Sequence, residues 1–245
     1  MILNVKKLNG HIDHAHFKMN TLKTALQLVK QGDWFISIDF SDAYFSIPAV
    51  KSHRKYLRFQ FRGVLYEYNV IPNGLKTGPR LFTKILKVPL SSLRQWLGLR
   101  VVGYLDDTLL MANSAAQVDQ QGVEAVHLFT HLGFHINKKK SVVLPQQKVE
   151  YLGFEIDSQN MTVKLTNDKA VRLLAHTLQF KQKQHCTIRD VAGLIGNLIA
   201  TEPGNPYALL YTKRLESEKS HALRQAQGNF HVPMTLTDWA VQDLD

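Results

Sequence analysis

The sequence predicts a mixed α/β fold of the α+β type, in which antiparallel strands are backed by helices. Short runs rich in β-branched and aromatic residues alternate with segments of helical spacing across residues 21–165. Two pairs of these runs are separated only by short turns, which favours antiparallel hairpins. From about Leu165 the pattern becomes mostly helical, so we expect a domain boundary at residues 163–166.

The composition is that of a chain that buries a core and carries excess positive charge. The 245 residues are 44% hydrophobic, and 30 Lys plus Arg against 20 Asp plus Glu give a net charge of +10. That charge favours an acidic partner such as nucleic acid, although a solvated basic surface would give the same count. The single cysteine, Cys186, excludes a disulfide framework and favours an intracellular, cytoplasmic or nuclear location. No apolar run approaches the ~20 residues of a membrane span, so no membrane partner is expected.

The first predicted elements lead to an acidic residue. Residues 21–31 show the spacing of an amphipathic helix, and Gly32 follows where a helix can end in a left-handed residue. Residues 34–38 form a short β-rich run consistent with a buried strand. Asp39 stands at the end of that strand.

A hairpin and a long helix are expected next. From Tyr56 on, apolar side chains at 57, 59 and 61 alternate with polar ones at 58, 60 and 62, which predicts a half-buried strand, and residues 64–68 form its return strand. Turn-forming residues at 71–74 precede Gly78-Pro79, which opens a helix because proline is tolerated in a first turn. Pro89 is expected to kink or end that helix.

The second hairpin carries two adjacent acids. Apolar runs at residues 101–105 and 108–112 flank Asp106 and Asp107, which places both carboxylates at the tip of the hairpin. Their repulsion calls for a cation, and oxygen-only ligands suit Mg²⁺. Together with Asp39, the pair could hold two metal ions for an in-line phosphoryl transfer. Taken alone, an Asp-Asp pair is more often ordinary turn material than a metal site.

Helices dominate the remainder. Ser114 with Gln117 three residues later predicts a capped helix that runs to about Leu132. Thr187 is a candidate N-cap. Four apolar residues behind it share one helix face, which predicts packing into a core: Val191, Leu194, Ile195 and Leu198. The charged residues 213–224 are expected to form a solvated helix.

The residues Tyr104-Leu105-Asp106-Asp107 resemble the Tyr-X-Asp-Asp signature of reverse transcriptases. Further segments resemble that family's motifs in the same order along residues 2–157: residues 2–9, 38–48, 72–79, 133–141 and 151–154. Residues 17–19 and 53–59 are most similar to DIRS-type retrotransposons. The resemblance implies a polymerase palm with partial fingers over residues 1–164 and a helical thumb or connection over residues 165–245.

The resemblance also implies roles for individual residues. The metal site would comprise Asp39, Asp106 and Asp107 with Phe40 beside them, and would hold two Mg²⁺ ions, with Mn²⁺ as a possible substitute. Lys140 would assist catalysis at the pyrophosphate, unless it is only part of a basic turn. The nucleotide would be bound by six residues: Asp42, Ala43, Tyr44, Asn73, Gly74 and Lys76. Primer and template would contact nine residues: Pro72, Gly78, Pro79, Tyr104, Leu105, Tyr151, Leu152, Gly153 and Phe154.

The implied function is DNA synthesis on an RNA or DNA template from a DNA primer and deoxynucleoside triphosphates. Tyr44 would exclude a ribose 2′-hydroxyl, or else simply fill the core. Two departures from the family pattern are the Asn73 side chain, where Gln or Phe is usual, and Met1 in place of an upstream arginine. The second departure raises the alternative of a truncated or decayed element that binds primer and template but polymerises poorly. The sequence leaves the oligomeric state and any further domains open.

Overall fold

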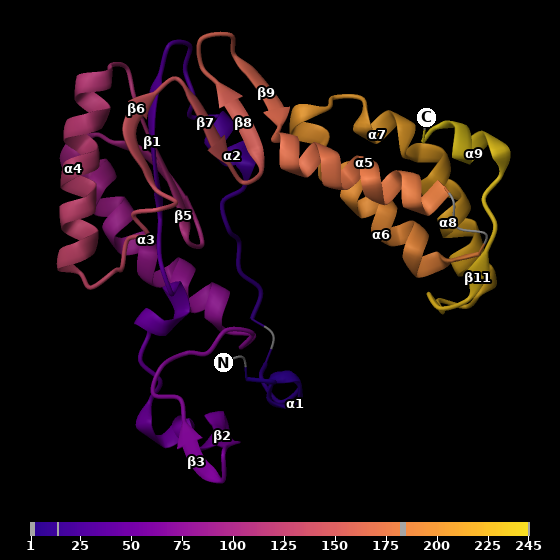
Figure 1. Cartoon of the computed structure of the whole chain (residues 1–245), viewed down its shortest axis with the longest axis horizontal. Coiled ribbons are helices and arrows are strands. Elements are labelled where there is room, and N and C mark those ends of the chain that lie inside the picture. Colours follow the sequence, from indigo (N-terminus) through magenta and orange to yellow (C-terminus); the bar gives the residue numbers. More distant parts are fainter. Residues whose placement is uncertain (1–2, 14, 182–184, 245) are drawn as a thin grey trace. The chain divides into compact units, whose positions relative to one another are not determined.

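The computed structural model describes residues 3–13, 15–181 and 185–244. The chain divides into two compact units. The first unit comprises Met1–Tyr151 with Asp157–Met161, and the second comprises Leu152–Ile156 with Thr162–Asp245. The path of the chain through both units is drawn in Figure 1.

A four-stranded sheet organises the first unit, with the strand order β4-β5-β1-β6. Its strands are β1 (Trp34–Asp39), β4 (Arg100–Tyr104), β5 (Asp107–Ala112) and β6 (Val142–Gln146). Strand β1 pairs antiparallel with β5, from Trp34 opposite Ala112 to Asp39 opposite Asp107. The predicted strand that ends at Asp39 and the predicted acidic hairpin are therefore confirmed as neighbours in one sheet.

Two helices, α3 (Gly78–Leu97) and α4 (Ala115–His131), cover one face of this sheet (Figure 1). The core between them contains four phenylalanines whose ring centroids lie 4.9–6.2 Å apart: Phe40, Phe82, Phe129 and Phe134. Gly122 lets α4 approach the sheet closely, because a Cβ there would come within 2.7 Å of the Ile36 side chain. The Ser114 hydroxyl accepts a hydrogen bond from the Gln117 amide, as the predicted cap of α4 requires.

Helix α3 does not end at Pro89, which corrects one of the two outcomes expected for this residue. The helix continues through this residue to Leu97. Pro89 is buried, and the apolar residues Leu86, Leu90 and Leu93 around it pack into the same core. Burial of a Leu side chain contributes about 1.5–3 kcal/mol, so this face offsets the roughly 3 kcal/mol cost of an internal proline.

The predicted helix over residues 21–31 is also too long. Helix α2 comprises only Leu22–Leu26. Beyond it the backbone amides take other partners, since the Lys30 amide is bound by the Asp33 carboxylate and the Gly32 amide by the Ser158 carbonyl. The Leu28 carbonyl, which a longer helix would use for an i→i−4 bond, accepts instead from the Arg100 guanidinium at 2.9 Å.

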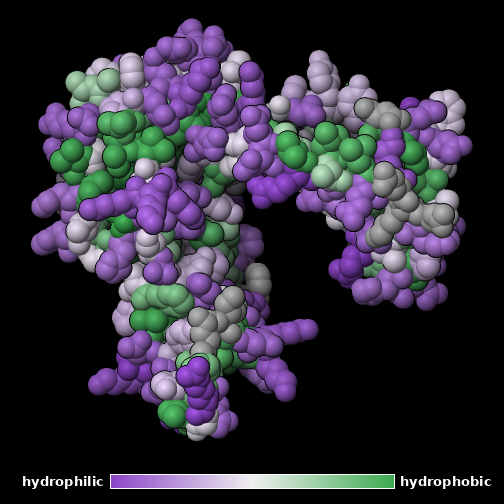
Figure 2. Space-filling model, viewed as in Figure 1, coloured by the Kyte–Doolittle hydropathy of each residue, from purple (hydrophilic) through white to green (hydrophobic). Residues whose placement is uncertain are grey.

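The first hairpin forms as predicted from β2 (Arg58–Phe61) and β3 (Val64–Glu67). The expectation that it is half-buried is wrong, because every residue of these two strands except Phe59 is exposed. Figure 2 shows hydrophilic and hydrophobic residues side by side on its surface. The two strands form a sheet of their own, so within the described residues no third strand extends it.

The first unit also contains several short elements. They are α1 (Lys6–Asn9), the 3₁₀ turns η1 (Ala43–Ser46) and η2 (Lys51–Leu57), and β7 (Lys148–Tyr151). Helix α1 precedes the extended segment that leads to α2, and η1 follows β1 directly. These short elements carry several of the candidate site residues.

The second unit is mostly helical, as the sequence predicts. Its elements are β8 (Phe154–Asp157), β9 (Thr162–Leu165), α5 (Asn167–Lys181), β10 (Cys186–Thr187), α6 (Ile188–Ile199), η3 (Glu202–Gly204), α7 (Ala208–Tyr211), α8 (Lys213–Gln225), β11 (Pro233–Met234) and α9 (Asp238–Gln242). Thr187 caps α6 through reciprocal hydrogen bonds with Asp190. Val191, Leu194 and Ile195 are buried in the core of this unit. Among the described helices, none combines the length and apolar character needed to cross a bilayer.

Candidate active site

The three candidate metal-binding acids lie at one end of the central sheet. Asp39 is the last residue of β1 and stands opposite Asp107, the first residue of β5. Asp107 is also paired with Tyr104 at the end of β4. Because paired residues of antiparallel strands have Cα atoms about 4.5–5.5 Å apart, the strand register itself brings two carboxylates together.

The hairpin tip places Asp106 beside them. Only Leu105 and Asp106 separate the paired residues Tyr104 and Asp107, and Leu105 has a left-handed φ of 51°. The Asp106 carbonyl accepts a hydrogen bond of 2.9 Å from the Phe40 amide. This bond fixes the exposed tip against the residue that follows Asp39.

The segment after α4 folds back over Asp39. The Asn137 amide donates to the Asp39 carbonyl at 2.8 Å, and the Asp39 amide donates to the Ser141 hydroxyl at 3.0 Å. The Lys140 ammonium lies 4.0 Å from an Asp39 carboxylate oxygen. Lys140 is 71% exposed, whereas the Asp39 side chain is only 14% exposed. A solvent-facing cation therefore stands at the edge of the acidic site.

The electrostatics of the site favour a bound cation. The pKa of Asp107 is raised to about 6 by burial and by the nearby charges of Asp106 and Asp39, and Lys140 opposes this shift only in part. All the donor atoms are carboxylate oxygens, which suits a hard divalent ion such as Mg²⁺. Within the described residues, no three His, Cys, Asp or Glu side chains converge as a ready ligand set.

The Phe40 ring and the Tyr151 hydroxyl support this site from the core side. Phe40 is only 3% exposed, so its backbone carbonyl is the only part that could reach a metal ion. The Tyr151 hydroxyl donates to the Asp107 carbonyl at 3.5 Å. Burial, and then the charge of Asp107, raise the pKa of Tyr151. Tyr151 thus remains a neutral donor beneath the hairpin.

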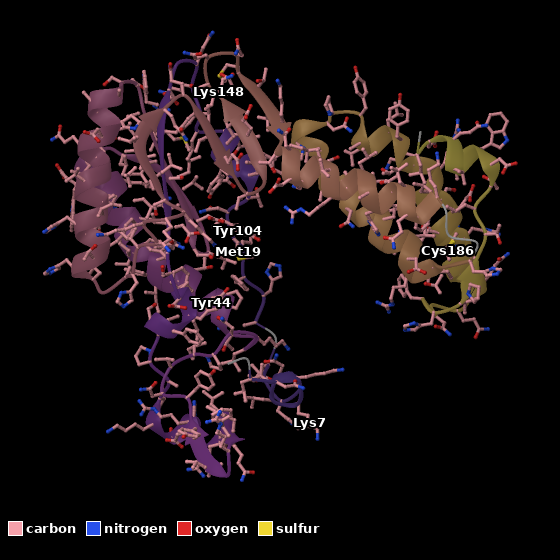
Figure 3. All side chains as sticks on the ribbon, viewed as in Figure 1. Lys7, Met19, Tyr44, Tyr104, Lys148 and Cys186 are labelled. Atoms are coloured by element: carbon pink, nitrogen blue, oxygen red, sulfur yellow. The ribbon has the colours of Figure 1, made fainter. Side chains whose placement is uncertain are left out.

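Tyr44 lies close to the hairpin tip. Its pKa is raised mainly by burial and then by Asp106 and Tyr104. Figure 3 labels both tyrosines, Tyr104 from β4 and Tyr44 from the 3₁₀ turn after β1. The Tyr44 ring packs edge-on against Phe82 with centroids 6.1 Å apart. A Cβ at Gly78 would lie 3.5 Å from the same ring, so Tyr44 is held between α3 and the acids.

Asp42 and Ala43 begin the turn that carries Tyr44. Asp42 adopts a left-handed conformation, with φ 53° and ψ 37°, and caps η1. Its carbonyl accepts hydrogen bonds from the Phe45 and Ser46 amides. Ala43 is the first residue of η1 and is partly buried. This turn reverses the chain after β1 and brings Tyr44 back toward the hairpin tip.

The loop before α3 is clamped by a residue that the sequence did not single out. The Asn9 side chain donates to the Gly74 carbonyl at 2.9 Å and accepts from the Lys76 amide at 2.9 Å. Gly74 has a φ of 89°, which favours glycine at this position. The Lys76 ammonium donates to the Ile12 carbonyl at 3.0 Å. Asn9 lies 65 residues from Gly74, so no local signal reveals the clamp.

Other candidates in this loop differ in accessibility. Asn73 is exposed, whereas Pro72 is buried and Pro79 is partly buried at the start of α3. Asn73 is therefore accessible to a ligand, and Pro72 serves the packing of the loop. Met1 and Ile2, at the start of the segment that resembles the fingers, lie outside the described residues.

The last candidate segment is a tight turn between β7 and β8. Leu152 and Gly153 have left-handed φ values of 52° and 77°. Phe154 belongs to the second unit, where the Lys169 ammonium lies 3.8 Å from the centroid of its ring. Burial lowers the pKa of Lys169. Sequence patterns did not indicate Lys169, because a single lysine in a first helical turn is ordinary.

Comparison with known proteins identifies the family. The family model described as "Reverse transcriptase (RNA-dependent DNA polymerase)" matches residues 1–156. The chain is 29% identical over 186 residues to the Gag-Pol polyprotein of Walleye dermal sarcoma virus, covering 76% of the chain and 10% of that polyprotein. It is 27% identical over 224 residues to the Gag-Pro-Pol polyprotein of Simian retrovirus SRV-2, covering 88% of the chain and 12% of that polyprotein. The chain thus spans only about a tenth of these relatives.

Solved structures show the same fold. A foamy viral protease-reverse transcriptase in complex with double-stranded DNA matches with a TM-score of 0.77 and 20% identity, over 100% of this chain and 39% of that one. The same viral protein with an RNA/DNA hybrid matches with a TM-score of 0.70 and 18% identity, over 99% of this chain and 30% of that one. These matches confirm the predicted mixed α/β fold. By its family match over residues 1–156, the chain belongs to the reverse transcriptase family.

Proposed function

We propose that this chain is the DNA-polymerising part of a retrotransposon protein, and that it extends a DNA primer on an RNA or DNA template. The observation that carries the proposal is the pairing of Asp39 with Asp107 at the ends of β1 and β5, with Asp106 next to them. Two partly buried acids with an exposed third beside them are unfavourable without a cation. They are well suited to hold the ions of a phosphoryl transfer.

The proposed catalytic residues are Asp39, Asp106, Asp107 and Lys140. The three carboxylates, with the Phe40 carbonyl nearby, would hold two Mg²⁺ ions or their Mn²⁺ substitutes. Such ions activate the attacking hydroxyl and stabilise the leaving oxygen. Lys140, exposed beside Asp39, would stabilise the charge of the departing pyrophosphate or donate a proton to it.

The proposed nucleotide site surrounds Tyr44. A deoxynucleoside triphosphate would lie with its sugar on the Tyr44 ring, which would clash with a 2′-hydroxyl. Asp42 and Ala43 shape the turn that carries this ring, and the loop with Asn73, Gly74 and Lys76 would border the nucleotide. The hydrogen bonds from Asn9 keep this loop in one conformation, which lowers the entropy that binding would cost.

The proposed primer and template surface uses residues at the ends of these elements. It comprises Pro72, Gly78, Pro79, Tyr104 and Leu105, together with the turn at residues 151–154. We assign residues 1–164 to partial fingers and palm, and residues 165–245 to a thumb or connection. The net charge of +10 supports contacts with phosphate backbones, which add affinity without sequence preference.

We further propose that the parent element is of DIRS type and that the protein acts in the cytoplasm or nucleus. Residues 17–19 and 53–59 support the first assignment, and the single cysteine supports the second. A chain that only binds primer and template is not favoured, because all three acids are present and paired strands bring Asp39 to Asp107.

Primer extension tests the proposal. A labelled DNA primer annealed to an RNA or a DNA template is incubated with the chain, deoxynucleoside triphosphates and either Mg²⁺ or EDTA. We expect extension on both templates with Mg²⁺ and none with EDTA. Asp39→Asn should abolish extension, whereas Asp119→Asn, a change at an exposed acid on α4, should not. Binding of the annealed primer without any extension would favour the binding-only alternative.

A further inference from the structure

Helix α4 presents two histidines to solvent one turn apart. His127 and His131 are both exposed, and their rings stack with centroids 6.4 Å apart and an interplanar angle of 9°. Residues four apart on a helix are neighbours on one face. We propose that His127 and His131 together bind one divalent transition-metal ion of the Ni²⁺, Cu²⁺ or Zn²⁺ class, at a site separate from the catalytic acids.

The geometry suits a chelate. Metal–nitrogen bonds are about 2.0–2.1 Å long, and both rings are exposed, so we expect rotation of the side chains to bring one nitrogen of each ring to a shared ion. Two histidines at i and i+4 on one helix face are a known arrangement for zinc. Imidazole nitrogen suits Zn²⁺, Cu²⁺ and Ni²⁺, whereas Mg²⁺ prefers oxygen ligands. The proposed site therefore discriminates against the ion that the acids would hold.

The surroundings of the pair also favour a cation. Glu124 lies three residues before His127 on the exposed side of α4 and adds negative charge there. No third His, Cys, Asp or Glu joins the pair as a ligand among the residues that the structure describes. Water would therefore complete the coordination, which makes the site open and its binding reversible.

A metal ion bound by this pair would stabilise α4, the helix that packs behind Asp39. Phe129 lies between the two histidines in sequence and is fully buried. Its ring packs edge-on against Phe40 with centroids 4.9 Å apart, and Phe40 directly follows Asp39. An ion that binds only when residues 127–131 are helical stabilises the folded state by mass action. The proposed site thus links a transition metal to the stability of the first unit.

Thermal unfolding and titration calorimetry of the full chain with NiCl₂ test the proposal. We expect Ni²⁺ to bind with one tight site per chain and to raise the melting temperature, with EDTA reversing the shift and equal Mg²⁺ having no such effect. His127→Asn and His131→Asn should each weaken binding at least about tenfold, because a single imidazole loses the gain in effective concentration from the second ligand. His221→Asn, at an exposed histidine on α8, should bind as the parent does.

A spacing variant separates chelation from histidine content. His131→Asn combined with Leu132→His keeps the histidine count but moves the second ring off the shared face, at an exposed position. We expect the tight site to be lost, while the helical circular dichroism stays unchanged. Tight binding that survives His131→Asn, or that persists in the spacing variant, would overturn the proposal and assign the ion to other histidines. Absence of a tight site in the parent chain would overturn it as well.

Discussion

Asp39 and Asp107 lie directly opposite each other on the antiparallel strands β1 and β5, each at the end of its strand. Side chains alternate between the faces of a sheet, so a slip of one residue in this pairing would turn one carboxylate to the other face. The register is held by buried residues along both strands, including Ile36, Ile38 and Leu110. The packing that fixes the register of these strands therefore also aligns the two carboxylates.

Sugar selection tests the role of Tyr44. Tyr44→Val removes the ring that would meet a 2′-hydroxyl, so we expect ribonucleotide incorporation to rise about tenfold or more relative to deoxynucleotide incorporation. Tyr44→Phe keeps the ring and should leave the ratio unchanged. Single-nucleotide extension with matched ribo- and deoxynucleotides measures the ratio of the two incorporation rates. An unchanged ratio in Tyr44→Val would mean that this ring only fills the space beside Phe82.

The Asn9 clamp should matter for nucleotide binding. Asn9→Ala removes two hydrogen bonds to the loop that contains Gly74 and Lys76. We expect a loss of about 1–3 kcal/mol in unfolding free energy, and a KM for nucleotide that rises several-fold while duplex affinity stays constant. Asn4→Ala is the matched control, because the side chain of this exposed asparagine accepts a local hydrogen bond from the Lys6 amide, two residues on. Equal kinetic effects from both variants would count against a clamp.

Loss of one partner from a buried ion pair should destabilise the first unit more than loss of an exposed pair. Arg100 donates to the carboxylate of Asp33, which is 1% exposed, and also to the Leu28 carbonyl. Arg100→Ala leaves that carboxylate buried without its cation, which should cost about 3–5 kcal/mol. Arg58→Ala breaks the exposed pair with Glu67 and should cost at most about 1 kcal/mol. Urea denaturation measures the unfolding free energy of both variants. Similar losses of unfolding free energy in Arg100→Ala and Arg58→Ala would show that burial of the ion pair does not decide its cost.

Low pH should reduce the stability that the Asp157 carboxylate contributes to the fold. Hydrogen bonds from the Asn160 side chain and amide, and then the Lys148 ammonium, lower the pKa of Asp157. Since the folded pKa lies below the unfolded value of about 3.9, this carboxylate stabilises the fold above that pH. The contribution disappears as the pH falls toward the lowered folded value.

The corresponding variant is Asp157→Asn. We expect it to be less stable than the parent at pH 7 and to depend less on pH between about 5 and 2, because the ionised form is no longer lost. Asp119→Asn, at an exposed acid, should retain the parent pH dependence. Urea midpoints across this range give the comparison, and parallel curves for the parent and Asp157→Asn would refute the linkage.

Local patterns predicted the strands and the acidic hairpin well, because the apolar runs that form β1, β4 and β5 are short, continuous and bounded by clear breaks. They failed where a distant residue decides the local structure. Helix α2 ends at Leu26, and the Leu28 carbonyl beyond it accepts from Arg100, 72 residues away, rather than from a helical amide. The proline in α3 is tolerated because the residues around it pack against the sheet.

The candidate site likewise contains some residues that the sequence predicted and others that it did not. Asp39 and the acidic tip were predictable from motif and strand position. The clamp from Asn9 to Gly74 and the contact of Lys169 with Phe154 were not, because each joins segments whose proximity exists only in the fold. Spacing of four residues on α4 was visible in the sequence, but the parallel stacking of His127 on His131 was not.

The most direct test of the central claim is the single-turnover rate of Mg²⁺-dependent primer extension by Asp107→Asn. Loss of one carboxylate that holds the ions should lower this rate by at least ~10²–10³, while the affinity for annealed primer and template stays within a few-fold of the parent. Asp119→Asn, tested in parallel, should extend at the parent rate. If Asp107→Asn extends the primer as fast as the parent, the acids at the ends of β1 and β5 are not the catalytic centre.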